Sequence, residues 1–286
     1  MKTTLSFSAI TTIFLTVLFF SASIVYAFEP GKKPPLNYNI ILDLSDRVLQ
    51  DHQVQKDMLL IEEMFKVFEI QARRGLILTS KDRFSVKIIP QKGSPLDVNY
   101  YENKLQLYLD EVAVKDKNTT ISKFSSTLQS TLQELVNACK YGETNGAYFG
   151  VDIWSYLYNN GISFEKLGYN NVAVIITDGY FDFENRSHVL KAENRFTSTQ
   201  FLKQLKGFDW MSIAQEKDYG LIPIALSRHV NWIVSGIESK NSQDILQTKK
   251  ITYFWEKWLK ESGAKNYHFI LNSSGRQMSS QLLAIL

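Results

Sequence analysis

Three polar loops in this sequence contain the residue types that a divalent-cation site requires. Asp43 and Ser45 lie two residues apart after one apolar run, and Asp178 directly follows another. Between them, a polar turn flanked by glycines contains Thr144 and Asn145. Hard cations such as Mg²⁺ take carboxylate, hydroxyl and water oxygens as ligands in proteins. The sequence therefore predicts an oxygen-ligand metal site, provided that the three loops meet in the folded chain.

The elements around these loops predict alternating strands and helices. The run Val172–Ile176 before Asp178 is too short for a buried helix and is typical of a central parallel strand. The other strands are expected at Asn39–Leu42, Phe84–Ile89, Leu221–Leu226, Trp232–Ile237 and Tyr267–Leu271. Helices are expected from the loop after Asp43 to about Arg74, and at Tyr101–Val114, Ser122–Tyr141, Gly146–Tyr158, Thr199–Leu205, Asp244–Glu261 and Gln277–Leu286. This alternation predicts a mostly parallel sheet with helices on both faces.

The position of the two aspartates within such a sheet is informative. In open α/β sheets a ligand binds outside the carboxyl ends of the strands, where the strand order reverses. Asp43 and Asp178 each follow directly after a strongly apolar predicted strand. We therefore expect both carboxylates at one edge of the sheet, next to each other if their strands are neighbours.

The combination of these motifs resembles a von Willebrand factor type A (vWA) domain. That family has a metal-ion-dependent adhesion site made of an Asp-x-Ser-x-Ser loop, a distant Thr and a later Asp in a Thr-Asp-Gly context. Here Asp43-Leu-Ser-Asp-Arg matches the loop, Thr144 the distant Thr and Asp178 the later Asp. The resemblance implies a Rossmann-like, doubly wound α/β fold and a metal site of Asp43, Ser45, Thr144 and Asp178. Mg²⁺ or Mn²⁺ is the expected ion, with Ca²⁺ as a further option.

One position departs from the family pattern, because Arg47 stands where the second loop Ser is expected. A guanidinium 4 Å from a carboxylate is worth ~4 kcal/mol at an intermediate dielectric, so Arg47 is able to neutralise the site itself. The first alternative is therefore a metal-free site closed by an Arg–Asp pair. In the second, Arg47 points into solvent and water completes the metal shell, or Asp46 acts as a substitute ligand.

The family mechanism is recognition and not catalysis. The metal keeps an open position, which an Asp or Glu of a partner protein completes, and Tyr180, Phe181 and Phe183 either form a contact rim or pack under a loop. One alternative is an assembly or structural subunit with a metal-free site closed by Arg47. A metal-dependent hydrolase is another, although no HExxH motif is present and Glu184 with His188 lacks a third zinc ligand in the sequence.

The first 27 residues have the organisation of a secretory signal peptide. Lys2 precedes an apolar stretch, and cleavage is expected after Ala27. An uncleaved membrane anchor is the alternative. Residues 28–36 form a proline-containing lead-in and residues 37–286 the vWA-like domain. We expect a secreted or periplasmic protein with no stable membrane span after cleavage.

Composition excludes several other classes of protein. The chain has 32 Lys and Arg against 29 Asp and Glu, a net charge of +3 without basic blocks, so nucleic acid is not an expected partner. Its single cysteine, Cys139, excludes an intrachain disulfide and lies on the apolar face of a predicted helix, where we expect it to fill the core.

Overall fold

A computed structural model describes residues 33–74, 76–91, 93–141, 150–182, 189–240 and 244–286 of the chain. One compact unit spans Pro35–Leu286. The expected signal peptide, most of the lead-in and Thr144 lie outside the described residues. Within them, no helix is both long and apolar enough to cross a membrane.

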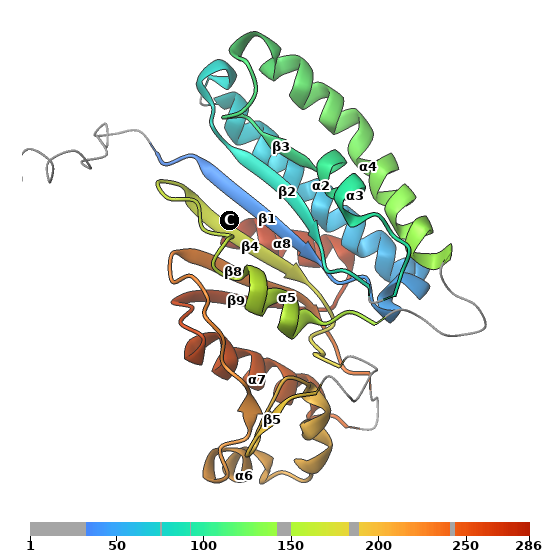
Figure 1. The fold of residues 1–286 in the computed structure, drawn as a ribbon, viewed down its shortest axis with the longest axis vertical. Helices are drawn as coiled ribbons and strands as arrows, with labels where there is room; N and C mark the ends of the chain where they lie inside the picture. The colour runs from blue at the N-terminus through green and yellow to red at the C-terminus, as the bar shows by residue number, and fades with distance from the viewer. Residues whose placement is uncertain (1–32, 75, 92, 142–149, 183–188, 241–243) are drawn as a thin grey trace, which may run out of the picture. The chain divides into compact units, whose positions relative to one another are not determined.

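A six-stranded, mostly parallel sheet forms the centre of this unit (Figure 1). Its strands are β1 (Leu36–Leu42), β2 (Arg83–Ile88), β3 (Gln106–Tyr108), β4 (Asn170–Ile176), β8 (Val230–Ile237) and β9 (Asn266–Leu271), in the order β3-β2-β1-β4-β8-β9. Counted along the chain, this order is 3-2-1-4-5-6, as in doubly wound sheets. Only β3 runs antiparallel to its neighbour. The order reverses between β1 and β4, which is where such a sheet places its ligand site.

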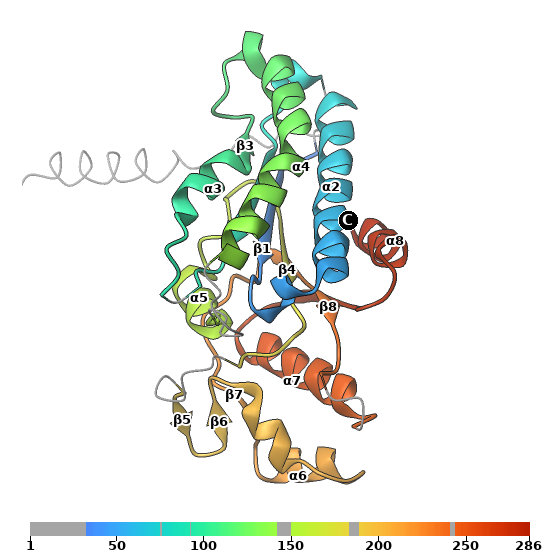
Figure 2. The same ribbon diagram turned by 90° about the vertical axis from the view of Figure 1, so that its right-hand side faces the viewer.

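Helices cover both faces of this sheet (Figures 1 and 2). One face packs against α2 (Asp51–Arg74), α4 (Lys117–Tyr141) and α8 (Gly275–Ile285), and the other against α5 (Ile153–Asn160) and α7 (Gln247–Glu261). Since side chains of a strand alternate between its faces, Ile40 of β1 enters the first core and Ile41 the second. This burial on both faces explains why the central strands are apolar without alternation. The expected α/β class is confirmed.

The long helix α2 shows how the apolar spacing positions a helix on the sheet. Met58, Ile61, Phe65 and Phe68 form the expected inward stripe and are at most 9% exposed. These residues recur every three or four positions, so they share one helical face. Cys139 of α4 is also buried in this core, as expected, and burial raises the pKa of its thiol to about 12.

The helix expected over Tyr101–Val114 is wrong in its second half. The helix α3 covers Val98–Lys104, and the chain then forms the edge strand β3, which pairs antiparallel with β2. Leu105, Leu107 and Leu109 are all buried, and this alternation with a period of two is typical of a strand. Burial of this alternating set against β2 outweighs the helical pattern that precedes it.

The strand expected at Leu221–Leu226 is also largely wrong. Only β7 (Gly220–Leu221) is extended in a ladder, and it belongs to a small separate sheet with β5 (Lys191–Ala192) and β6 (Arg195–Phe196). Beyond it, the backbone N–H groups of Ile224 and Leu226 donate to the hydroxyl and the carbonyl oxygen of Ser262, 3.1 and 2.9 Å away. Pro223, which directly precedes Ile224, has no N–H to donate to a ladder.

The remaining elements follow the predicted order with shifted ends. The 3-10 helix η1 (Asp46–Leu49) precedes α2, and the 3-10 helix η5 (Thr199–Gln204) occupies the segment expected to be helical near Thr199. The helix α6 (Trp210–Glu216) follows it and was not predicted. The helix expected over Gly146–Tyr158 is described from Ile153 to Asn160 as α5, and residues 146–149 lie outside the described residues.

Candidate functional site

The structure brings Asp43 and Asp178 together at the switch point of the sheet. Their strands β1 and β4 are parallel neighbours that pair Leu42 with Ile176, so both aspartates emerge at the same carboxyl edge. The Asp43 backbone N–H donates to the Ile176 carbonyl at 3.1 Å, and the Thr177 hydroxyl donates to Asp43 Oδ2 at 2.8 Å. Both aspartates are 2% exposed. The loops of Asp43 and Asp178 therefore lie next to each other, as predicted.

Two buried carboxylates this close repel each other, and the effect is visible in Asp43. Burial, and then the charge of Asp178, raise the pKa of Asp43, which is about 6 once all its neighbours are included. The positive charge of Arg47 and the hydrogen bonds from Thr177 and Ser45 act in the opposite direction. The pair is thus compensated only in part by its surroundings.

Arg47 points into the protein and not into solvent. Its side chain is 2% exposed, and its Nη2 lies 2.9 and 3.1 Å from the two carboxylate oxygens of Asp57 on α2. The guanidinium also packs on Gly236 of β8, where an added Cβ would lie 3.0 Å from Arg47 Nη2 and 3.0 Å from the Thr177 carbonyl oxygen. Gly236 has a positive φ of 98°, which favours glycine at this position. The solvent-facing alternative for Arg47 is therefore wrong.

The charge of Arg47 acts on the aspartate pair even without direct hydrogen bonds to it. Burial by itself would lower the pKa of Arg47, but Asp57, and then Asp178 and Asp43, raise it overall. Its Nε and Nη1 are buried and donate to no group in the described part of the chain. Arg47 is thus a permanent, buried positive charge near the two aspartates.

Lys240 supplies a second positive charge at the solvent side of the pair. Its Nζ lies 2.8 Å from Asp178 Oδ2 and 3.0 Å from each carboxylate oxygen of Asp46. Burial alone would lower its pKa, but Asp178 and then Asp46 raise it, so the amine stays charged. The side chain remains 42% exposed. Lys240, which follows β8, therefore links Asp178 after β4 to Asp46 of η1 through one ammonium group.

The predicted metal ligands are engaged by groups of the chain itself. The Ser45 hydroxyl donates to Asp46 Oδ1 at 3.2 Å, and the Ser45 N–H donates to Asp43 Oδ1 at 3.0 Å. Lys240 takes Asp178 Oδ2, and Thr144 lies outside the described residues. Among the described residues, no group of three or more His, Cys, Asp or Glu is arranged to hold a metal. In this arrangement Lys240 occupies Asp178 Oδ2 and the Ser45 hydroxyl is directed at Asp46, so the described residues are not arranged as the shell of a metal ion.

The sequence patterns missed three residues of this site, Asp57, Gln53 and Lys240. Gln53 Nε2 donates to Asp57 Oδ1 at 2.8 Å, and its Oε1 accepts from Asn272 Nδ2 at 3.1 Å. Asn272 also donates to Glu238, so a polar network links α2 with the ends of β8 and β9. One signal was available: Asp57 precedes Met58 on the inward stripe of α2, where a carboxylate requires a buried partner.

The aromatic residues after the site have mixed roles. Phe181 is 3% exposed and packs against Trp255 with ring centroids 4.4 Å apart, so it belongs to the core. Tyr180 is partly exposed, and its hydroxyl oxygen accepts the backbone N–H of Lys240 at 3.1 Å. Phe183, Glu184 and His188 lie outside the described residues.

Comparisons with known proteins give similarity in fold only. No protein-family model matches the chain, and no curated protein matches it. The pilus adhesin SpaC from Lactobacillus rhamnosus GG, in its open conformation, is similar at 8% identity and a TM-score of 0.44, over 89% of this chain and 30% of SpaC. Proximal thread matrix protein 1 from the mussel byssus is similar at 11% identity and a TM-score of 0.35, over 88% of this chain and 47% of that one. The chain thus spans less than half the length of either structure, and similarities at this level do not say what it binds.

Proposed function

We propose that this chain is a vWA-like partner-binding module whose site is filled by cations of the chain itself. The observation that carries the proposal is the pair of positive charges around Asp43 and Asp178. Arg47 is buried and is held by Asp57, while the partly exposed Lys240 contacts Asp178. In this form the site is built for recognition, and Arg47 and Lys240 take the place that a metal has in the family.

The exposed part of the site supports a protein partner. Lys240 is partly accessible, so its ammonium is the group that an Asp or Glu of a partner would meet. Leu49 of η1 and Ile245, on the segment that leads into α7, are 46% and 82% exposed. Interfaces combine apolar side chains with a polar rim, and η1 carries both kinds of residue in Leu49 and Asp46.

Binding is favoured over hydrolysis by the hydrogen-bond partners of the two aspartates. Asp43 accepts from Ser45 and Thr177, while Asp178 accepts from the Tyr180 N–H and pairs with Lys240. A general base must have a lone pair directed at a water or substrate. If the chain is a metal-dependent hydrolase instead, turnover of a substrate panel should require metal and be lost in Asp178→Ala.

A second candidate is the metal-dependent form of the same module. It is favoured by an excess of carboxylates: Asp46 and Asp178 share Lys240, Arg47 is paired with Asp57, and Asp43 has no ion pair among the described residues. Mg²⁺ or Mn²⁺ held by Asp43, Ser45, Thr144 and Asp178 would supply an open position for a partner carboxylate. Lys240 would have to leave its place for this ion to bind.

Thermal unfolding with Mg²⁺, with Mn²⁺ and with a chelator distinguishes the two forms. We expect the same melting temperature for the wild-type chain in all three conditions. Arg47→Ser combined with Lys240→Ala should make melting metal-dependent, by ~2.7 kcal/mol at metal a hundredfold above the dissociation constant, because it removes both competing cations. Lys265→Ala, which removes an exposed lysine of the segment before β9, is the matched control and should not respond.

Two outcomes would contradict this proposal. Metal stabilisation of the wild-type chain that Asp43→Ala abolishes would establish the metal-dependent form. No metal response in any variant, including the double variant, would show that the site does not bind cations and would favour a purely structural subunit.

A further inference from the structure

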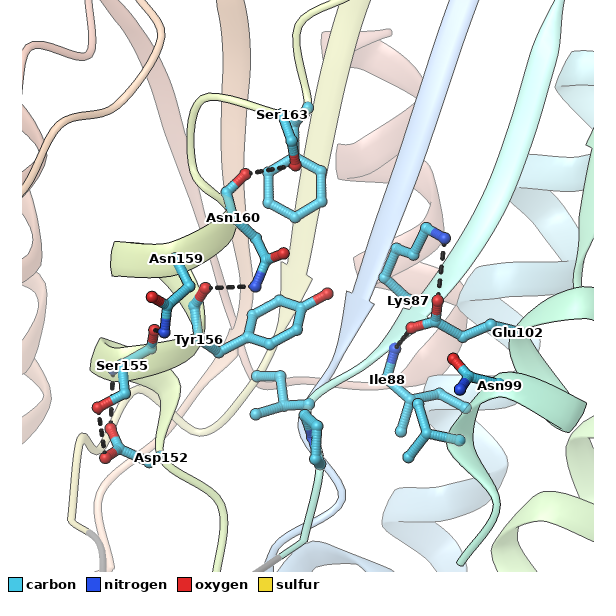
Figure 3. A pocket seen from close by; sticks show the side chains of 14 residues that line it. Lys87, Ile88, Asn99, Glu102, Asp152, Ser155, Tyr156, Asn159, Asn160 and Ser163 are labelled. Atoms are coloured by element: carbon cyan, nitrogen blue, oxygen red, sulfur yellow. Dashed lines mark hydrogen bonds and ion pairs between the residues drawn. The ribbon is translucent and has the colours of Figure 1, made fainter.

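A second polar site lies apart from the aspartate pair, in a groove between α5, α3 and β2 (Figure 3). Its volume is about 560 Å³, within the range of small-molecule sites. One wall is formed by α5, with Ser155, Tyr156 and Asn160, and the opposite wall by Lys87 of β2 with Asn99 and Glu102 of α3. Neither wall contains a residue of the predicted metal site.

The groove exists because the edge of β2 is covered by a side chain and not by another strand. The strand β3 pairs only with Arg83–Ser85, so the outer edge of β2 is free of a strand beyond that point. There Glu102 Oε1 accepts the backbone N–H of Ile88 at 2.9 Å. This contact satisfies the edge and blocks addition of a peptide strand, so β-augmentation is not available to a ligand here.

The three charged side chains of the groove, Lys87, Glu102 and Asp152, are all engaged by neighbouring groups. Lys87 Nζ lies 2.9 Å from Glu102 Oε2, and both side chains are mostly buried, at 23% and 19% exposure. Asp152 is occupied at the start of α5, where it accepts from the backbone N–H and the hydroxyl of Ser155 at 2.9 and 2.7 Å. Without an uncompensated charge at the Lys87–Glu102 pair, this part of the groove favours a neutral ligand over an anion or a cation.

Two polar groups of the groove are free to bind a ligand. The Tyr156 hydroxyl points across the groove from α5 towards β2 (Figure 3), and it has no hydrogen-bond partner among the described residues. Burial, and then the charge of Glu102, raises the pKa of Tyr156, so its hydroxyl stays protonated. The Asn99 amide on the opposite wall likewise has no partner within the described part of the chain. Hydroxyl and amide groups both donate and accept hydrogen bonds, as a sugar hydroxyl does.

We propose that this groove binds a neutral polyhydroxylated ligand of one or two sugar rings. The Tyr156 hydroxyl and the Asn99 amide bind ligand hydroxyls from opposite walls. The proposal does not depend on the state of Asp43, Asp178 or Lys240.

The test is a screen of neutral mono- and disaccharides against the chain from residue 28 onwards, followed by calorimetric titration of those that bind. We expect saturable binding to at least one of them. Tyr156→Phe keeps the ring and removes the hydroxyl, and Asn99→Ala removes the amide. Each should weaken binding ~3- to 10-fold, the effect of one neutral hydrogen bond.

Matched controls are available on the same two helices. Tyr158→Phe changes an exposed tyrosine of α5 that stacks on Trp154 outside the groove, and Asn103→Ala changes an exposed asparagine one turn after Asn99. Both should bind like the wild-type chain, and all four variants should keep its melting temperature.

Three results would overturn the proposal. The first is the absence of binding to every neutral saccharide at millimolar concentration. The second is binding that Tyr156→Phe and Asn99→Ala leave unchanged. The third is selective binding of acidic sugars or of short peptides that these two variants weaken, because it would assign the groove to another class of ligand.

Discussion

At the scale of single residues, the most informative position is Arg47, where the family pattern has a serine. The sequence allowed this arginine to close the site or to face solvent. The structure places Arg47 inside, because its Nη2 donates a hydrogen bond to Asp57 and because Gly236 leaves room for the guanidinium. A buried charge requires such a partner, since an unpaired one is costly in a protein interior. The character of the site therefore depends on a residue of α2 that no loop motif contains.

This pair gives a stability prediction. Asp57→Leu leaves Arg47 as a buried charge without its partner, so the free energy of unfolding should fall by about 3–5 kcal/mol, measured by urea denaturation. Adding Arg47→Met should restore most of the loss, because an apolar pair removes both charges. Asp51→Leu at the exposed start of α2 is the control and should change the urea midpoint little. Equal losses in the single and double variants would contradict the pairing.

At the scale of elements, a polar cluster ties β2 to the segment before β4. Arg83 at the start of β2 donates to both carboxylate oxygens of Asp110, with contacts of 2.7–2.9 Å. The Tyr169 hydroxyl donates to the same carboxylate at 3.0 Å. This cluster lies at the amino end of the strands, opposite the edge with Asp43 and Asp178. It holds the ends of β2 and β4 on the two sides of β1, and so supports the register that brings the aspartates together.

The cluster predicts a pH dependence of stability. Burial alone would raise the pKa of Asp110, but the bonds from Arg83 and Tyr169 outweigh it and lower the pKa below its ordinary value of 3.8. The folded state thus binds this proton less readily than the unfolded state. The stabilisation by Asp110 is full above pH 3.8 and is lost as the pH falls through its folded pKa.

The measurement is a comparison of the wild-type chain with Asp110→Asn by urea denaturation at several pH values. The variant should be less stable at neutral pH, and the difference should shrink as the solution becomes more acidic than the ordinary Asp pKa. Asp97→Asn at the start of α3 is the comparison variant and should lower stability less at neutral pH, because Asp97 accepts a single backbone N–H at 3.0 Å. A difference between Asp110→Asn and the wild-type chain that does not change with pH would refute the assignment.

At the scale of the whole unit, two separate cores lie on the two faces of one sheet. Ile40 and Ile41 are consecutive residues of β1, both 0% exposed, and they belong to different cores. Because helices cover both faces, the sheet has no solvent-facing side at its centre. The strand order that produces this arrangement also creates the switch point at which Asp43 and Asp178 meet.

This arrangement predicts that both faces are equally sensitive to truncation. Ile40→Ala and Ile41→Ala should each lower the free energy of unfolding by about 2–5 kcal/mol, because each leaves a cavity in a packed core. The exposed Ile245→Ala should stay within about 0.5 kcal/mol of the wild-type chain in the same urea experiment. A small effect at Ile41 with a large one at Ile40 would show that α5 and α7 are not packed on the sheet as described.

The sequence by itself determined the alternation of strands and helices and the two aspartates that follow β1 and β4. Local apolar spacing specifies which face of an element is buried, and the chain order of parallel strands limits where their ends meet. The sequence did not reveal β3, because its alternating pattern covers only three leucines and directly follows a helical pattern. Only the tertiary structure decided that Arg47, Asp57 and Lys240 surround the pair. Their contacts join residues as far apart as Asp46 and Lys240, and the favoured side-chain orientation depends on which charges burial brings together.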